Sequence, residues 1–154
     1  MSDVSLSRKL ARYAHNLRYE DLPADVVACT KRFLYDSVGC AFGGYGTEDV
    51  GIVLDLIKDE KSSPDCTIMG SGEKASPRYA ALANALMIRA LDFNDIYWKE
   101  DPSHPSDIMP AAFSAAELAG RNGKDLLTAI VLAYEVEMRL CLFATPGIRE
   151  RKWH

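Results

Sequence analysis

The sequence has few of the features that mark metal-binding or disulfide-bonded proteins. Its four cysteines are widely spaced, and no pair follows the C-x-x-C pattern of zinc sites and thiol oxidoreductases. We therefore expect neither a zinc site nor a redox motif, and we expect reduced thiols that pack as small apolar side chains. The four positions are Cys29, Cys40, Cys66 and Cys141.

An excess of positive charge and a long apolar run are also missing. The formal net charge is −4, which supplies no basic field for nucleic acid. Residues 1–16 mix charged and apolar side chains, unlike a signal peptide, and the most apolar later run, residues 126–136, is too short to span a bilayer. The sequence predicts a cytoplasmic protein with no nucleic-acid partner and no membrane association.

The alternation that marks strands is almost absent, whereas helical periodicity recurs along the chain. Apolar spacing, capping residues and glycine or proline stops predict about six helices, and one short strand is expected at residues 66–69. The 154 residues give room for one domain. The expected fold class is mostly α, a helical array with at most one or two short strands. The helices are expected near residues 6–17, 23–38, 47–57, 77–91, 106–120 and 125–143.

Acidic residues follow the most apolar of these helices. Residues 79–91 contain few strongly polar side chains, so a buried helix is expected there. If it continues to Asp95, then Asn84, Asp92 and Asp95 share one side, because steps of eight and eleven residues return almost to the same face. Buried carboxylates need donors, water or a ligand as partners. His104 is the nearest candidate in the sequence.

The residues after His104 suggest a place for an anion. Ser106 is expected to cap the next helix, which would leave the N–H groups of Asp107 and the residues after it free at a helix N-terminus. An imidazole beside such a terminus and near two acids can protonate a leaving hydroxyl or take a proton next to a carboxylate. Those are the steps of a dehydratase that acts on a hydroxy acid.

Two other interpretations of these residues stay open. The acids could simply end a helix and cap a loop, with the histidine a surface residue before a proline. A metal-dependent hydrolase is the other, although one histidine with scattered carboxylates matches no sharp ligand spacing. Its ligands would be Asp92, Asp95, His104 and Asp107.

Two strings carry a resemblance to a known family. Leu-Asp-Phe-Asn-Asp at residues 91–95, followed by His-Pro-Ser-Asp at residues 104–107, resembles the hallmark of the MmgE/PrpD family, which includes 2-methylcitrate dehydratase and cis-aconitate decarboxylase. Residues 33–40 resemble the family's early helix end, residues 111–123 its alanine-rich helix and turn, and residues 134–140 its following helix. The likeness covers essentially the whole chain.

The resemblance implies that residues 1–154 form the N-terminal helical domain of an MmgE/PrpD-like lyase, with the family's C-terminal lid domain absent from this chain. It implies the removal of water from a citrate-like tricarboxylic acid without a metal or other cofactor. The implied catalytic residues are Asp92, His104 and His154, and the residues expected to bind the substrate are Asp95, Ser106 and Asp107.

The resemblance leaves the reaction and the partners open. The step from Asp92 to His104 resembles the dehydratase branch more than the decarboxylase branch. The alternatives are a cis-aconitate decarboxylase-like enzyme or a non-catalytic helical association domain. A shortened chain would expose apolar surface, so we expect a homo-oligomer, a dimer, or association with a complementary C-terminal fragment. A tricarboxylate also needs cationic donors, for which Arg89 and Lys99 are local candidates.

Overall fold

The computed structural model describes residues 4–60, 63–99, 102–143, 150 and 152. Within these residues it contains six α-helices, two short 3-10 helices and one two-stranded antiparallel sheet. The expectation of a mostly helical array with at most a short sheet is confirmed. The elements are α1 (Leu6–Asn16), η1 (Tyr19–Asp21), α2 (Ala24–Gly44), α3 (Glu48–Lys58), β1 (Cys66–Thr67), β2 (Lys74–Ala75), α4 (Pro77–Arg89), η2 (Pro105–Ile108), α5 (Met109–Leu118) and α6 (Gly123–Phe143).

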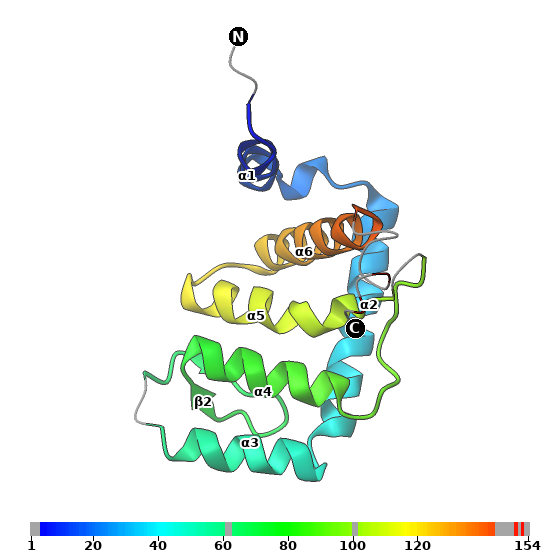
Figure 1. Cartoon of the computed structure of the whole chain (residues 1–154). Helices are drawn as coiled ribbons and strands as arrows, with labels where there is room; N and C mark the ends of the chain where they lie inside the picture. The colour runs from blue at the N-terminus through cyan, green and yellow to red at the C-terminus, as the bar shows by residue number, and fades with distance from the viewer. Residues whose placement is uncertain (1–3, 61–62, 100–101, 144–149, 151, 153–154) are drawn as a thin grey trace.

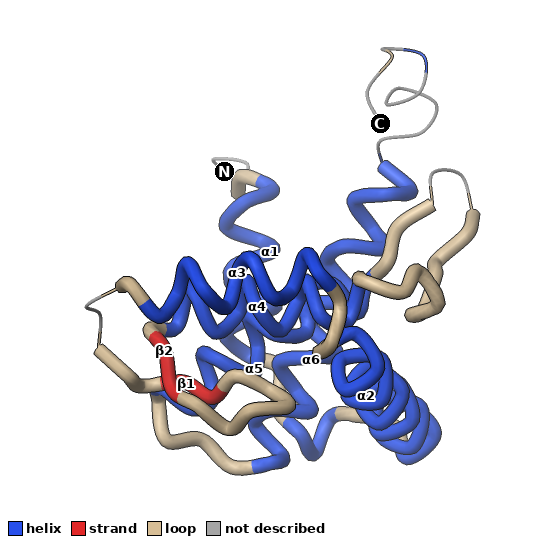
Figure 2. The backbone as a smooth tube through the Cα atoms, turned by 90° about the horizontal axis from the view of Figure 1, so that it is seen from below, coloured by secondary structure: helices blue, strands red, loops and turns tan. Residues whose placement is uncertain are grey.

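Four helices lie side by side in the order α3, α4, α5, α6, and α2 runs across their ends (Figure 1). Seen from below, α2 is viewed nearly end-on beside this layer (Figure 2). The central helix α4 contacts α2, α3, α5 and both strands. This position explains why α4 is apolar on nearly all sides, as the sequence predicts. Helix α1 lies beyond α6 and contributes no buried residue.

Most buried apolar side chains of the described residues fall into two groups, which we call the first core and the second core. The first core joins α2, α3, the hairpin and α4 around Met87 and Ile88. The second core joins α5 and α6 around Met109 and Ile130. Cys40 and Cys66 are buried in the first core, and desolvation by burial raises the pKa of both thiols. These two cysteines pack as small apolar residues, as expected.

Helices α2 and α4 approach each other closely at Gly44. Gly44 is buried at the end of α2, and a Cβ atom placed there would lie 2.1 Å from the backbone oxygen of Met87. The two backbones therefore meet where only glycine fits. Helix α2 continues to Gly44 instead of ending near residue 38, because packing on α4 outweighs the weak helix propensity of its glycines.

The buried polar residue of α4 serves the hairpin. Asn84 is 1% exposed, accepts a hydrogen bond from the N–H of Met69 at 2.8 Å, and donates one to the carbonyl of Thr67 at 2.9 Å. Asn84 would share a side with Asp92 and Asp95 only on a longer helix, and α4 ends before the two acids. Asn84 satisfies backbone groups of the short hairpin.

In the part of the chain that the structure describes, none of the helices combines the length and the apolar character needed to cross a membrane.

Candidate active site

The segment between α4 and η2 carries the acids and the histidine. Helix α4 ends at Arg89, close to the expected end at residue 91, so the condition of a continuation to Asp95 is not met. The chain turns at Asp92, whose φ of 53° lies in the left-handed region that aspartate adopts more readily than most residues. Asp92 and Asp95 therefore enter the site from a loop.

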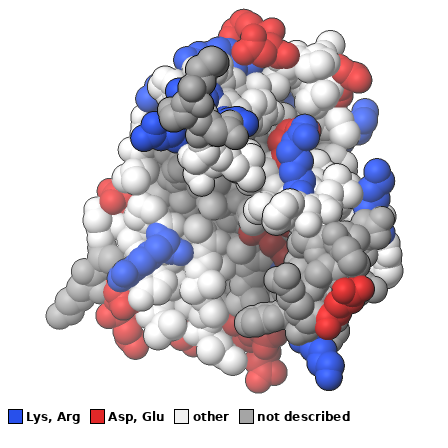
Figure 3. Space-filling view, turned by 45° about the horizontal axis from the view of Figure 1, so that its top comes forward, with Lys and Arg blue, Asp and Glu red and all other residues white. Residues whose placement is uncertain are grey.

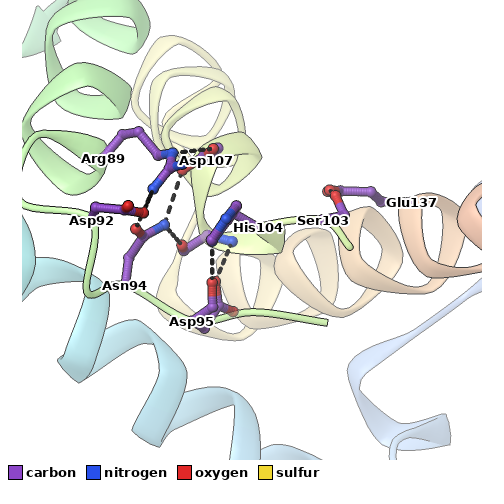
Figure 4. Close-up of polar contacts among 9 residues, drawn as sticks. Arg89, Asp92, Asn94, Asp95, Ser103, His104, Asp107 and Glu137 are labelled. Carbon is purple, nitrogen blue, oxygen red and sulfur yellow. Dashed lines mark hydrogen bonds and ion pairs between the residues drawn. The ribbon is translucent and has the colours of Figure 1, made fainter. Parts of the chain in front are cut away.

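Asp95 accepts hydrogen bonds at its carboxylate and at its backbone carbonyl, and Figure 4 shows it facing His104. Its Oδ1 accepts the N–H of Ser106 at 2.9 Å, and its Oδ2 accepts the O–H of Tyr134 at 2.7 Å. Its backbone carbonyl oxygen lies 2.7 Å from Nδ1 of His104. Asp95 thus joins the loop, η2 and α6 at one point.

The contact with a carbonyl oxygen determines which nitrogen of His104 carries the proton. A carbonyl oxygen only accepts hydrogen bonds, so Nδ1 must be the donor. In the neutral imidazole this leaves Nε2 as the basic nitrogen. The ring is half-buried, and within the described residues its hydrogen bonding uses Nδ1 alone. Nε2 is therefore the atom that could give or take a proton.

Arg89, at the end of α4, forms ion pairs with Asp92 and Asp107. Its Nη1 donates to a carboxylate oxygen of Asp92 and lies 3.5 Å from Oδ1 of Asn94. Its Nε lies 3.8 Å from Oδ2 of Asp107. Arg89 is the candidate cation that points to the site, whereas Lys99 is exposed in the loop.

Asn94 connects Arg89 to η2. This side chain is 7% exposed, and its Nδ2 donates to Oγ of Ser106 at 2.8 Å and to Oδ1 of Asp107 at 3.0 Å. The contacts of Asn94, Arg89 and Asp95 unite the expected site residues of this region into one group, which we call the site cluster. Its members are Arg89, Asp92, Asn94, Asp95, His104, Ser106 and Asp107.

The helix start after His104 differs from the expectation. Ser106 does not cap an α-helix: it lies inside η2, which begins at Pro105, and α5 begins only at Met109. The N–H groups of Asp107 and Met109 are bonded within this 3-10 turn, to the carbonyls of His104 and Ser106. The N–H of Ser106 binds the carboxylate of Asp95, so the carboxylate at this terminus is the chain's own.

Helix α6 supplies two groups that the sequence argument missed. Tyr134 holds Asp95, and Glu137 accepts a hydrogen bond from the hydroxyl of Ser103. The available signal was a carboxylate three residues after Tyr134, because residues at this spacing share one face of a helix. The two side chains hold both ends of the loop that precedes His104.

Burial and neighbouring charges separate the acids into two kinds. The hydrogen bond and charge of Arg89 lower the pKa of Asp92, which is exposed. Desolvation by burial raises the pKa of Asp107, and Arg89 opposes this effect. Desolvation also raises the pKa of Glu137, with the charges of Asp107 and Asp95 adding to it.

Acidic groups outnumber cationic ones around His104. Arg89 already contacts Asp92 and Asp107, and Asp95 adds a third carboxylate. On the face shown in Figure 3, Lys and Arg side chains are interspersed with Asp and Glu side chains, and acidic atoms are visible in the hollow near the centre. Among the described residues, no group of three or more His, Cys, Asp or Glu is arranged to hold a metal ion. His154 lies outside the described residues.

The sequence of the chain matches a known protein family. Residues 8–154 match the family model described as the MmgE/PrpD N-terminal domain. The chain belongs to the MmgE/PrpD family. This match confirms the resemblance on which the site was first assigned.

Individual relatives carry two kinds of name. Cis-aconitate decarboxylase of Homo sapiens is 32% identical over 146 residues, 91% of this chain and 30% of that protein. Cis-aconitate decarboxylase of Aspergillus terreus is 28% identical over 141 residues, 88% of this chain and 29% of that protein. A probable 2-methylcitrate dehydratase of Saccharomyces cerevisiae is 26% identical over 145 residues, 84% of this chain and 28% of that protein. The chain thus spans less than a third of these relatives' length. The comparisons indicate a lyase-type function at the level of the family.

Proposed function

We propose that the chain is the N-terminal helical domain of a lyase that removes water from a citrate-like tricarboxylic acid. The observation that supports this most is the anchoring of His104 through Nδ1, which leaves Nε2 available for proton transfer. In the proposed reaction a base takes the proton from the carbon beside a carboxylate. The electron pair of that carbon–hydrogen bond forms a carbon–carbon double bond as the carbon–oxygen bond breaks, and the hydroxyl leaves as water after receiving a proton.

The roles that we propose follow the positions of the side chains. His104 acts as the general acid or base, and Asp92 orients the imidazole or the substrate. His154 is proposed as the second proton-transferring group. Asp107 is proposed to contact the substrate. Asp95 and Ser106, which hydrogen bond to each other, are proposed to hold the substrate-binding region in shape.

Charge suggests that the proposed site needs groups from elsewhere. A tricarboxylate requires several cationic donors, and Arg89 is already shared between Asp92 and Asp107. Further cations would have to come from other parts of a longer protein or from a partner chain. We therefore expect the isolated chain to bind citrate weakly, with no turnover in a tricarboxylate assay.

The test compares histidine variants of the full-length gene product. His104→Gln should lower turnover of 2-methylcitrate by about 100- to 10,000-fold, because it removes a group that transfers a proton. His15→Gln is the matched control, since His15 lies exposed on α1 and should leave turnover unchanged. Unchanged turnover in His104→Gln would remove this residue from the proposed mechanism.

A cis-aconitate decarboxylase activity is the second candidate. The higher identity to the relatives with that name favours it. An imidazole could serve there by giving a proton to the carbon that loses carbon dioxide. Parallel assays with 2-methylcitrate and cis-aconitate separate the two reactions, because only one of them releases carbon dioxide.

We also propose a cytoplasmic homodimer, or a complex with a complementary C-terminal fragment. Large apolar side chains that are exposed in the described part of the chain, including Tyr35, Trp98 and Phe143, support association. Sizing the 154-residue chain alone and with the downstream polypeptide tests this. A stable monomer that binds neither the fragment nor a tricarboxylate would also count against a non-catalytic association domain.

A further inference from the structure

Tyr134 lies in the middle of α6 with its ring packed and its hydroxyl bonded. The residue is 7% exposed, and its ring stacks on Phe33 of α2 with 5.6 Å between the ring centroids. Its hydroxyl donates to Oδ2 of Asp95 at 2.7 Å. Burial raises the pKa of Tyr134, and the nearby carboxylate of Asp95 raises it further, so the phenol keeps its proton and remains a donor.

The contacts of Asp95 extend from this hydroxyl to the imidazole. The Tyr134 hydroxyl and the Ser106 N–H hold the two oxygens of the carboxylate, which fixes the side chain at both of its acceptors. The carbonyl of the same residue accepts the Nδ1 hydrogen of His104. A change in the position of the carboxylate would therefore move the carbonyl that sets the protonation pattern of the ring.

We propose that Tyr134 is a positioning residue for His104 and acts on it through Asp95. This inference rests on the proposed function, in which Nε2 of the imidazole transfers the proton. The hydroxyl of Tyr134 hydrogen bonds to Asp95, whereas the imidazole hydrogen bonds to the carbonyl of Asp95. Tyr134 is therefore proposed to act through Asp95 and not by contact with the substrate. It keeps the carbonyl of Asp95 facing Nδ1, so that the ring presents the unprotonated Nε2.

The competing explanation is that Tyr134 matters only through its ring. Tyr134→Phe tests this, because it keeps the aromatic stack on Phe33 and removes only the hydroxyl. Phe33→Leu is the matched control, since it changes the stack and leaves the hydroxyl in place. Both variants are made in the full-length gene product.

Two measurements distinguish positioning from packing. The first is steady-state kinetics: Tyr134→Phe should lower kcat by about 10- to 100-fold and change KM by less than about twofold, the size expected for loss of one hydrogen bond to a charged group. The second is the nitrogen NMR spectrum of the imidazoles. The signals of His104 are assigned by their loss in His104→Gln.

The NMR spectrum of Tyr134→Phe should show a smaller population of the Nδ1-protonated ring, while Phe33→Leu should resemble the parent in both measurements. Equal losses of kcat in Tyr134→Phe and Phe33→Leu, or an unchanged tautomer population in Tyr134→Phe, would overturn the positioning role. If Tyr134→Phe fails to fold, Asp95→Asn weakens the same link from its other end and should give the same spectral change.

The two levels of the proposal fail in different ways. Full activity in His104→Gln would refute the proposed function, whatever Tyr134→Phe does. Loss of activity in His104→Gln together with parental kinetics in Tyr134→Phe would refute only the positioning role. The NMR measurement needs no substrate, so it tests the link between Tyr134 and His104 directly.

Discussion

Replacing Gly44 with alanine should destabilise the fold through the contact between α2 and α4. The added Cβ atom would lie 2.1 Å from the oxygen and 3.0 Å from the carbonyl carbon of Met87. An ordinary contact between carbon and oxygen is longer by roughly 1 Å, so the two helices would have to separate by about that distance. Overpacking of this kind costs about 1–3 kcal/mol, and the rigid backbone of Met87 favours the upper end.

Gly39 provides a matched control on the same helix. It is exposed, and a Cβ atom there would meet no other atom within 4 Å. Gly39→Ala should therefore raise stability by about 0.5–1 kcal/mol through helix propensity alone. The two variants should differ by about 3 kcal/mol, or roughly 100-fold in the folding equilibrium. Urea denaturation followed by far-UV circular dichroism measures this difference. Equal stability of Gly44→Ala and Gly39→Ala would refute the inferred close contact.

Two further predictions concern buried polar groups. Asn84→Ala should lower the free energy of unfolding by about 2–4 kcal/mol, because the N–H of Met69 and the carbonyl of Thr67 both lose their partner. Urea denaturation measures this loss, and the amide of Met69 should exchange faster with solvent. The raised pKa of Glu137 adds stability that is fully present below its ordinary value of 4.5 and is lost as the pH rises through the folded pKa. Glu137→Gln keeps an acceptor for Ser103, so its melting temperature should rise relative to that of the parent as the pH increases above 4.5, whereas a constant difference would contradict the assignment.

The helices could be predicted from the sequence because each is marked by a local pattern of capping and apolar residues. Pro77 after Ser76 marks the start of α4, and the apolar pattern of residues 79–91 predicts its central position. The ends of some helices were harder to predict. Helix α2 passes through Gly39 and ends only at Gly44, since its length depends on a contact with α4 that no local pattern reveals.

The sequence predicted that the acids and the histidine lie together, but it did not predict the geometry that joins them. The acids and the histidine do come together, but from a loop that turns at Asp92, which a continuous helix would have excluded. Tyr134 was missed because it follows Asp95 by 39 residues and resembles a core residue in its local pattern. Such long-range pairing depends on how α6 packs against α5, and the sequence offers no spacing rule for it.

The site cluster is supported by elements that belong to different cores. Arg89 comes from α4 of the first core, whereas Tyr134 comes from α6 of the second core. Local opening of either half would dismantle the arrangement around His104 while the helices of the other half persist. The helical content measured by circular dichroism would then overestimate the fraction of molecules in which the site cluster is intact. The less stable half would determine how long the imidazole keeps its orientation.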